Sequence, residues 1–173
     1  MRPMRTLLPS LAIGLGLASL ALTSIARADG PTFGDHVRTW ADEAGYRITA
    51  HDDCEDTVES KFGGKVAVCF SAKHKKKVGN FHPRMTITEA NYASEEKAKE
   101  RVASLRAAPP GEDIDDESHK SYPLRAAFRL GDKVVVLTTD AFAFRPYIDR
   151  AAAELAKETG GTDVTCWTTC SQP

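Results

Sequence analysis

Two segments of alternating polarity are separated by only two residues, Gly131-Asp132, and this spacing is the strongest constraint on the fold. Apolar side chains fall on every second position of Leu124–Leu130, and Lys133–Thr139 is largely apolar. A period of two is typical of a β-strand, and a two-residue turn that begins with glycine joins antiparallel neighbours. The sequence therefore predicts a β-hairpin, and with it an antiparallel sheet.

Periodicity in the rest of the chain predicts three more strands and three helices. The strands are Tyr46–His51, Lys65–Ser71 and Met85–Ala90. The helices have apolar stripes at Phe33, Val37, Trp40 and Ala44, at Ala98, Val102 and Leu105, and at Ile148, Ala152 and Leu155. The predicted fold class is α+β: an antiparallel sheet of about five strands with helices packed on one face, a two-layer sandwich.

The first 28 residues have the pattern of a bacterial signal peptide. Basic residues precede an uncharged apolar run, Leu11–Leu22, and Ala26-Arg27-Ala28 has the small-x-small pattern that signal peptidase recognises. We expect cleavage after Ala28, which leaves no stable membrane span and places the protein in the periplasm or outside the cell. An uncleaved anchor is the alternative, because residues 6–25 approach the length of a bilayer span.

The processed chain has the size of one domain. We expect residues 1–28 to be the signal peptide, residues 29–161 a single α+β domain, and residues 162–173 a cysteine-containing tail. Without the leader the chain has 20 Lys+Arg and 24 Asp+Glu, a net charge of −4. This balance argues against nucleic acid as a partner. The expected partner is an unknown protein or an anionic component of the cell envelope.

Four cysteines, all in the processed chain, predict a disulfide framework because an exported protein meets an oxidising environment. They are Cys54, Cys69, Cys166 and Cys170. Proximity in sequence favours the pairs 54–69 and 166–170, and the other two connectivities stay open. A strict hairpin at Gly63-Gly64 would place Val58 opposite Cys69, so Cys54 must come from a longer loop or an irregular segment.

The same cysteines allow two functional alternatives. His51, Cys54, Cys69 and His74 are spaced like a zinc site. Cys166 and Cys170 are separated by three residues, a spacing that suits thiol redox chemistry or Cu(I) binding without being specific for either. Oxidation after export favours structural disulfides over both, so no cofactor is expected.

A run of basic residues forms the predicted binding surface. Its lysines are Lys73, Lys75, Lys76 and Lys77, with His74 between the first two. Such a run suits an anionic partner, although it is also typical of a solvated turn. The acidic segment Gly111–Lys120 is the second candidate contact. The acidic clusters 52–56 and 112–117 lack the EF-hand pattern.

Sequence motifs of the common enzyme classes are absent: there is no Gly-x-Ser-x-Gly, His-Glu-x-x-His, Walker loop or Gly-x-Gly-x-x-Gly. Acid and base side chains exist at His82, His119, Tyr122 and Asp140. No spacing assigns them to one site. A binding module is therefore favoured over an enzyme, and an enzyme with a dispersed active site is the further alternative.

Overall fold

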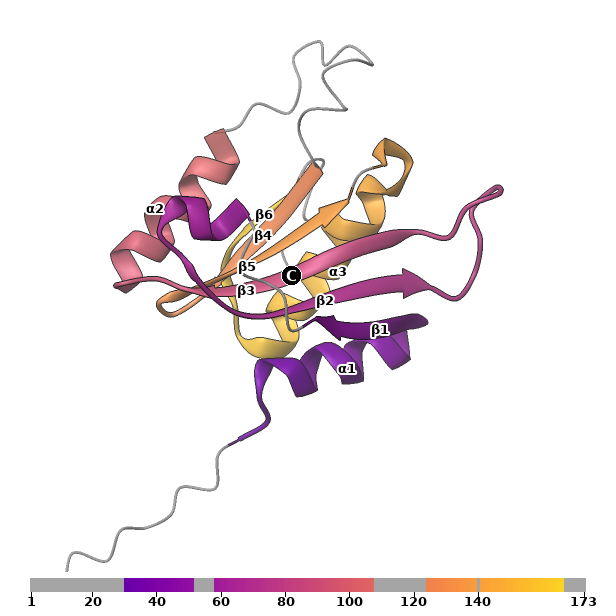
Figure 1. Ribbon diagram of the computed structural model, residues 1–173, viewed down its shortest axis with the longest axis horizontal. Coiled ribbons are helices and arrows are strands. Elements are labelled where there is room, and N and C mark those ends of the chain that lie inside the picture. Colours follow the sequence, from indigo (N-terminus) through magenta and orange to yellow (C-terminus); the bar gives the residue numbers. More distant parts are fainter. Residues whose placement is uncertain (1–29, 52–57, 108–123, 140, 167–173) are drawn as a thin grey trace, which may run out of the picture.

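A computed structural model describes residues 30–51, 58–107, 124–139 and 141–166 (Figure 1). These residues form one antiparallel six-stranded sheet in the order β1-β2-β3-β5-β4-β6, which confirms the predicted α+β fold. The strands are β1 (Tyr46–His51), β2 (Lys65–His74), β3 (Arg84–Asn91), β4 (Leu124–Leu130), β5 (Lys133–Thr139) and β6 (Thr162–Thr165). The helices are α1 (Phe33–Ala44), α2 (Glu95–Ala107) and α3 (Arg145–Thr159), with short 3₁₀ helices η1 (Val58–Phe62) and η3 (Phe142–Phe144).

The β4–β5 hairpin forms as predicted. Leu130 lies opposite Lys133, and the two-residue turn between them has Gly131 at a φ of 60°. A positive φ is strained for residues with a side chain, which explains glycine at the first turn position. Every other strand pair of the sheet is antiparallel as well.

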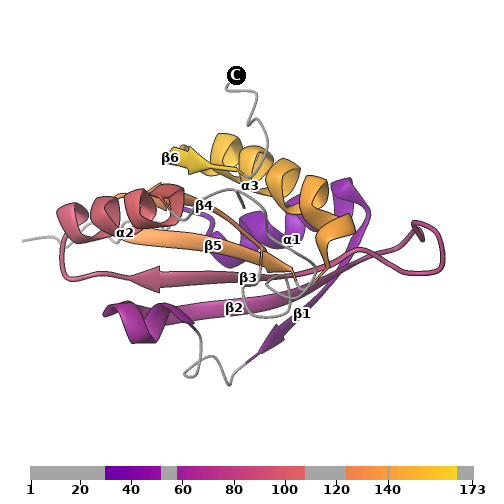
Figure 2. The same cartoon turned by 90° about the horizontal axis from the view of Figure 1, so that it is seen from above.

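Helices cover both faces of the sheet, which differs from the expected one-sided arrangement. Val135 and Leu137 belong to the core that α1 and α3 cover. Val134 and Val136 point the opposite way, into a second core that Ala98 and Val102 of α2 complete, and α2 lies over β4 and β5 (Figure 2). Because β5 is apolar on both sides, both of its faces need a covering layer.

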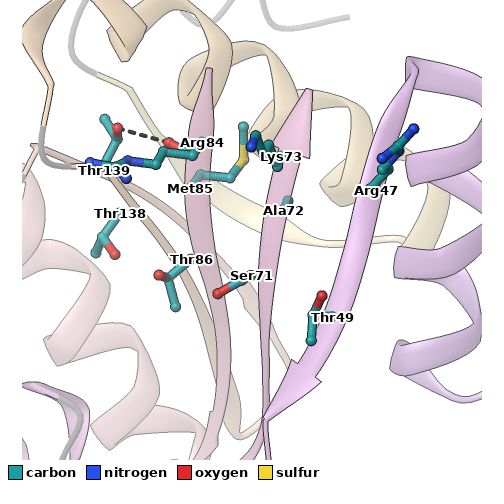
Figure 3. Close-up of a pocket in the computed structure, with 10 residues that line it drawn as sticks. All are labelled: Arg47, Thr49, Ser71, Ala72, Lys73, Arg84, Met85, Thr86, Thr138 and Thr139. Atoms are coloured by element: carbon teal, nitrogen blue, oxygen red, sulfur yellow. Dashed lines mark hydrogen bonds between the residues drawn. The ribbon is translucent and has the colours of Figure 1, made fainter. Parts of the chain in front are cut away.

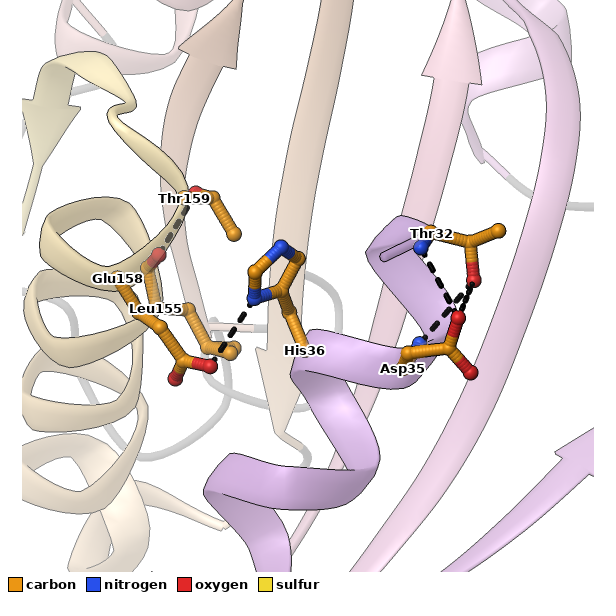
Figure 4. A network of polar contacts seen from close by, with 6 residues as sticks. All are labelled: Thr32, Asp35, His36, Leu155, Glu158 and Thr159. Carbon is orange, nitrogen blue, oxygen red and sulfur yellow. Dashed lines mark hydrogen bonds and ion pairs between the residues drawn. The ribbon is translucent and has the colours of Figure 1, made fainter. Parts of the chain in front are cut away.

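Helix α1 begins at a capping box, shown in Figure 4, and ends at a glycine. The Asp35 amide donates to the Thr32 hydroxyl (3.2 Å), and the Thr32 amide donates to the Asp35 carboxylate (2.9 Å), forming a capping box. The hydrogen bonds from Thr32 hold the pKa of Asp35 below its ordinary value. Gly45 ends the helix in the left-handed conformation.

Two polar contacts fasten α1 to α3. His36 Nδ1 lies 3.1 Å from Glu158 Oε1 (Figure 4). Trp40 Nε1 donates to Glu154 Oε2 at 2.9 Å, while its ring stacks on Tyr46 at the start of β1. Helix α1 therefore contacts both α3 and β1.

The sheet continues into the segment predicted as a tail. Strand β6 pairs with β4, so that Thr165 lies opposite Ala127, and the Thr165 hydroxyl accepts a hydrogen bond from the Ala127 amide (3.1 Å). Arg129 Nε donates to Asp163 at 2.8 Å. The folded domain therefore extends past the predicted boundary at residue 161. The strand is only four residues long, too short to show a periodic pattern.

Candidate functional site

Among the described residues, α2 covers mainly one half of its side of the sheet. On the side that faces α2, the helix contacts β4, β5 and β6. Away from α2, the described residues of β1, β2 and β3 form a depression of about 560 Å³ that reaches the end of β5 (Figure 3). We call this depression the sheet groove. Its lining residues are Arg47, Thr49, Ser71, Ala72, Lys73, Arg84, Met85, Thr86, Thr138 and Thr139.

A row of hydroxyl groups crosses the groove. Thr49 lies opposite Ser71, and Ser71 lies opposite Thr86. Thr86 in turn lies opposite Thr138 on β5. Directly opposite residues in antiparallel strands project to the same side of the sheet, so the four hydroxyls form one line, visible in Figure 3. His51 Nε2 lies 2.7 Å from the Ser71 hydroxyl at the margin of this row.

A row of basic side chains lies beside the hydroxyls. Arg47 is opposite Lys73, and Lys73 is opposite Arg84. All three residues are exposed. Like charges that face each other across strands destabilise a sheet. The pair Arg47 and Lys73 therefore costs stability unless an anion lies against it.

The groove is electropositive. None of the described residues that line it is acidic. Within the described part of the chain, neither Arg47 nor Lys73 forms an ion pair with a carboxylate. The backbone register of β1 and β2 thus holds two cations without a counter-ion among the described residues, in a cavity that also offers hydroxyl donors and acceptors.

Arg125 extends the hydroxyl row toward α2. It lies opposite Thr138, on β4, and its Nε is buried without a hydrogen-bond partner. Burial lowers the pKa of Arg125, and the nearby positive charge of Arg101 lowers it further. A guanidinium stays charged even so, which makes this end of the row electropositive as well.

A buried ion pair holds η1 against α2 on the same side of the sheet. Arg101 Nη2 and Nε donate to the two oxygens of Glu59 at 2.7 Å and 2.9 Å, and the Tyr92 hydroxyl donates to Glu59 at 2.6 Å. Phe62 covers the guanidinium from the outside, its ring centre 3.8 Å from the Arg101 Cζ. Burial raises the pKa of Tyr92, and its hydrogen bond to Glu59 raises it further. The Tyr92 hydroxyl therefore keeps its proton near neutral pH and donates it to the hydrogen bond with Glu59.

The two described cysteines lie far apart in the sheet. Cys69 lies on β2 opposite His51, and Cys166 follows β6; neither is a free cysteine. Three strands separate β2 from β6, roughly 19 Å along the sheet, whereas bonded cysteines have Cα atoms within roughly 7 Å. Cys69 and Cys166 are therefore not bonded to each other, which removes one of the three connectivities. Cys54 and Cys170 lie outside the described residues, so the favoured pairing stays a prediction.

Three of the four candidate zinc ligands are described, and these three do not converge. His51 lies opposite Cys69, whereas His74 lies opposite Tyr46, five residues farther along β2 and about 17 Å from Cys69. His74 packs instead between the rings of Tyr46 and Tyr147, with centroids 4.9 Å and 5.9 Å away. A single ion cannot bind both histidines. No group of three potential ligands gathers in the described part of the chain.

The predicted lysine surface divides into two parts. Lys73 lines the sheet groove, whereas Lys75, Lys76 and Lys77 lie in the loop between β2 and β3. Lys75 Nζ is 3.8 Å from Asp42 Oδ1 on α1. Of the acid and base candidates, His82 donates from Nδ1 to the His74 carbonyl (2.9 Å), which gives it a structural role.

Several other candidate residues lie outside the described residues. They are His119, Tyr122, Asp140, the acidic segment Gly111–Lys120 and the cluster 52–56. The enzyme alternative is therefore untested by geometry.

Most of the groove is not predictable from the sequence. Lys73 was a candidate, but Arg47, Arg84 and the four hydroxyl residues were not. A signal exists for Arg47, Thr49, Ser71 and Thr86, since each occupies the polar position of an alternating strand. That pattern is also typical of any solvated face, so only the register between strands shows that these positions meet.

Comparison with models of protein families, with curated proteins and with solved structures finds no match for this chain. Among the described residues, no helix has the length and apolar character needed to cross a membrane. The function proposed below is therefore based on the geometry of the sheet groove.

Proposed function

We propose that this protein is an exported, disulfide-stabilised binding domain that holds a small anionic ligand in the sheet groove. The observation that carries this proposal is the pair Arg47 and Lys73. Both are exposed, they face each other across β1 and β2, and they have no carboxylate partner among the described residues. An anionic group between them would relieve their repulsion and gain charge-assisted hydrogen bonds.

The hydroxyl row suggests what the rest of the ligand contains. Thr49, Ser71 and Thr86 can each donate and accept a hydrogen bond, and they lie two residues along their strands from the basic row, on the same side of the sheet. A ligand that joins an acidic group to a polar body, such as a phosphorylated sugar or a sugar acid, matches both rows. A purely apolar ligand would leave the hydroxyls unsatisfied.

Titration calorimetry tests this proposal. We expect the protein to bind glucose 6-phosphate more tightly than inorganic phosphate, and not to bind glucose, because the acidic group supplies most of the affinity. Arg47→Gln and Lys73→Gln should each weaken binding about 10-fold or more, the equivalent of one charge-assisted hydrogen bond. Thr86→Val should weaken the binding of the sugar phosphate but not the binding of inorganic phosphate.

Lys65→Gln is the matched control. Lys65 is exposed on the same strand, β2, but at its other end and outside the groove. This variant removes the same charge from the protein as Lys73→Gln and should bind like the wild type. Equal weakening by both variants would indicate a general charge effect, and the absence of binding by any phosphate probe would contradict the proposal.

Intact mass tests export and disulfides together. For protein purified from its own envelope we expect a chain that starts at Asp29, lighter than the reduced form by the hydrogens of two disulfides, with no added ion. Alkylation without reduction should add nothing. Free thiols, or a retained zinc or copper ion, would support the redox or metal alternative instead. Tryptic mapping then identifies the pairs, for which we expect 54–69 and 166–170.

The fold supports the first of these pairs. Cys69 lies opposite His51, and Cys54 is only three residues beyond His51 in sequence. Extended chain covers about 10 Å in three residues, which is ample to reach a facing strand. The loop closed by this disulfide would include η1, the segment that carries Glu59.

A further inference from the structure

The loop between β2 and β3 projects beyond the rest of the domain. Figures 1 and 2 both show this loop extending past the ends of its neighbouring strands. We define the hairpin tip as residues 75–82. It includes Lys75, Lys76 and Lys77, followed by Val78, Gly79, Asn80, Phe81 and His82. None of its residues lines the sheet groove, so the tip is a second surface.

The tip exposes apolar side chains that nothing in the described structure covers. Phe81 is 71% exposed and Val78 is 42% exposed. These two residues form a backbone bridge, in which the Val78 amide donates to the Phe81 carbonyl at 2.7 Å, so their side chains share one side of the hairpin. Phe62 is the third exposed large apolar residue among those described. Its contact with Arg101 explains its position on the surface.

The tip is held in a defined conformation. Gly79 has a φ of 60°, as the first position of a type II′ turn requires, and Gly79-Asn80 connects the bridged pair. Below the turn, the Lys76 amide donates to His74 Nδ1 (3.1 Å) and the Lys75 amide donates to the Gly45 carbonyl (2.8 Å). The exposed pair is thus presented by an anchored hairpin rather than by a loose segment.

Positive charge borders the apolar pair. Lys76 and Lys77 directly precede Val78; both are exposed, and neither forms an ion pair with a described residue. An aromatic ring at a protruding tip, next to lysines, matches the interface of an anionic membrane. The ring enters the boundary between headgroups and acyl chains, while the ammonium groups contact lipid phosphates.

We propose that the hairpin tip docks the protein on an anionic lipid surface, with Phe81 and Val78 inserted and Lys76 and Lys77 on the phosphates. An acidic protein would satisfy the lysines, whereas an anionic lipid surface also accounts for the exposed phenylalanine beside them. This proposal is independent of ligand binding in the groove, because it uses none of the groove residues.

Sedimentation of the processed protein with vesicles tests the proposal. We expect binding to phosphatidylcholine vesicles that contain phosphatidylglycerol, weak or no binding to pure phosphatidylcholine, and loss of binding as salt rises. Each lysine near an anionic surface contributes about five-fold in affinity, so Lys76→Glu with Lys77→Glu should reduce binding by at least about 25-fold. Phe81→Ser should reduce it about 10-fold or more with the charge unchanged.

Two further variants make the result specific. Lys65→Glu with Lys99→Glu changes the net charge equally at exposed lysines outside the tip, and it should bind like the wild type apart from a small general charge effect. Phe81→Trp should show a blue-shifted emission on anionic vesicles, which reports entry of the ring into the bilayer. All of the substituted positions are exposed, so the variants should remain folded, which circular dichroism checks.

Three outcomes would overturn the proposal. The first is equal binding to neutral and anionic vesicles, or no binding to either. The second is a variant with Lys76→Glu and Lys77→Glu that binds vesicles as tightly as the wild type or as the Lys65/Lys99 control. The third is binding of the Phe81→Trp variant without a fluorescence shift of the introduced indole, which would indicate that the tip does not insert.

Discussion

Arg101→Met is expected to destabilise the protein by about 3–5 kcal/mol, because it leaves the Glu59 carboxylate buried without its counter-ion. Glu59 is 2% exposed and Arg101 is 7% exposed, and both guanidinium contacts are short. Methionine keeps the apolar length of the arginine, so the measured loss reports the lost charge more than lost packing. Urea denaturation followed by circular dichroism measures it.

Two comparisons separate the buried pair from ordinary surface pairs. Lys97 and Glu100 form an exposed ion pair on the same helix, with Nζ to Oε2 at 2.7 Å, and Lys97→Met should change the stability far less than Arg101→Met. Replacing both partners, Arg101→Met with Glu59→Leu, should recover most of the loss, because no buried charge then remains. A loss below about 1 kcal/mol for Arg101→Met alone would show that Glu59 is hydrated.

Phe128→Ala is expected to cost about 3–5 kcal/mol, since this fully buried ring fills the centre of the larger core. The same ring explains why residue 161 is glycine. A Cβ at Gly161 would lie 2.6 Å from Phe128 Cδ2 and 3.1 Å from the Ala156 Cα. Gly161→Ala should therefore cost about 1–3 kcal/mol by overpacking the site where α3 turns into β6.

The double variant distinguishes this steric explanation from others. Phe128→Ala with Gly161→Ala should be less destabilised than the sum of the two single variants, because the cavity left by the ring accepts the added methyl group. Rescue should be partial, since the contact with Ala156 remains. Gly30→Ala is the control: a Cβ there would meet nothing within 4 Å, and stability should stay within about 0.5 kcal/mol. Strict additivity would contradict the steric explanation.

Local features were predictable from the sequence because short-range geometry governs them. The Thr32–Asp35 capping box, the Gly45 helix end and the Gly131-Asp132 hairpin depend on neighbouring residues only, and all three are present. Polarity with a period of two or of about 3.6 located five strands and three helices, all of which the structure contains. The α+β class follows from this order of elements.

Irregular features depend on contacts that no periodic pattern encodes. Val66, Val68 and Phe70 occupy alternate positions of β2, a pattern that by itself places them on one face. In the structure a register shift between Val66 and Val68 turns Val66 toward α2 and Tyr92. Likewise, η1 replaces a simple reversal at Gly63-Gly64, because Glu59 finds Arg101 42 residues away.

What the sequence determined by itself is which residues share one side of each strand or helix, and therefore the class of fold. What only the tertiary structure decided is how those sides are covered. Strand order and register bring Arg47, Lys73 and Arg84 into one row, and the placement of α2 over β4 and β5 leaves that row open. The physical reason is that periodicity reflects burial along one segment, whereas a binding site arises where several segments meet and a covering layer is missing.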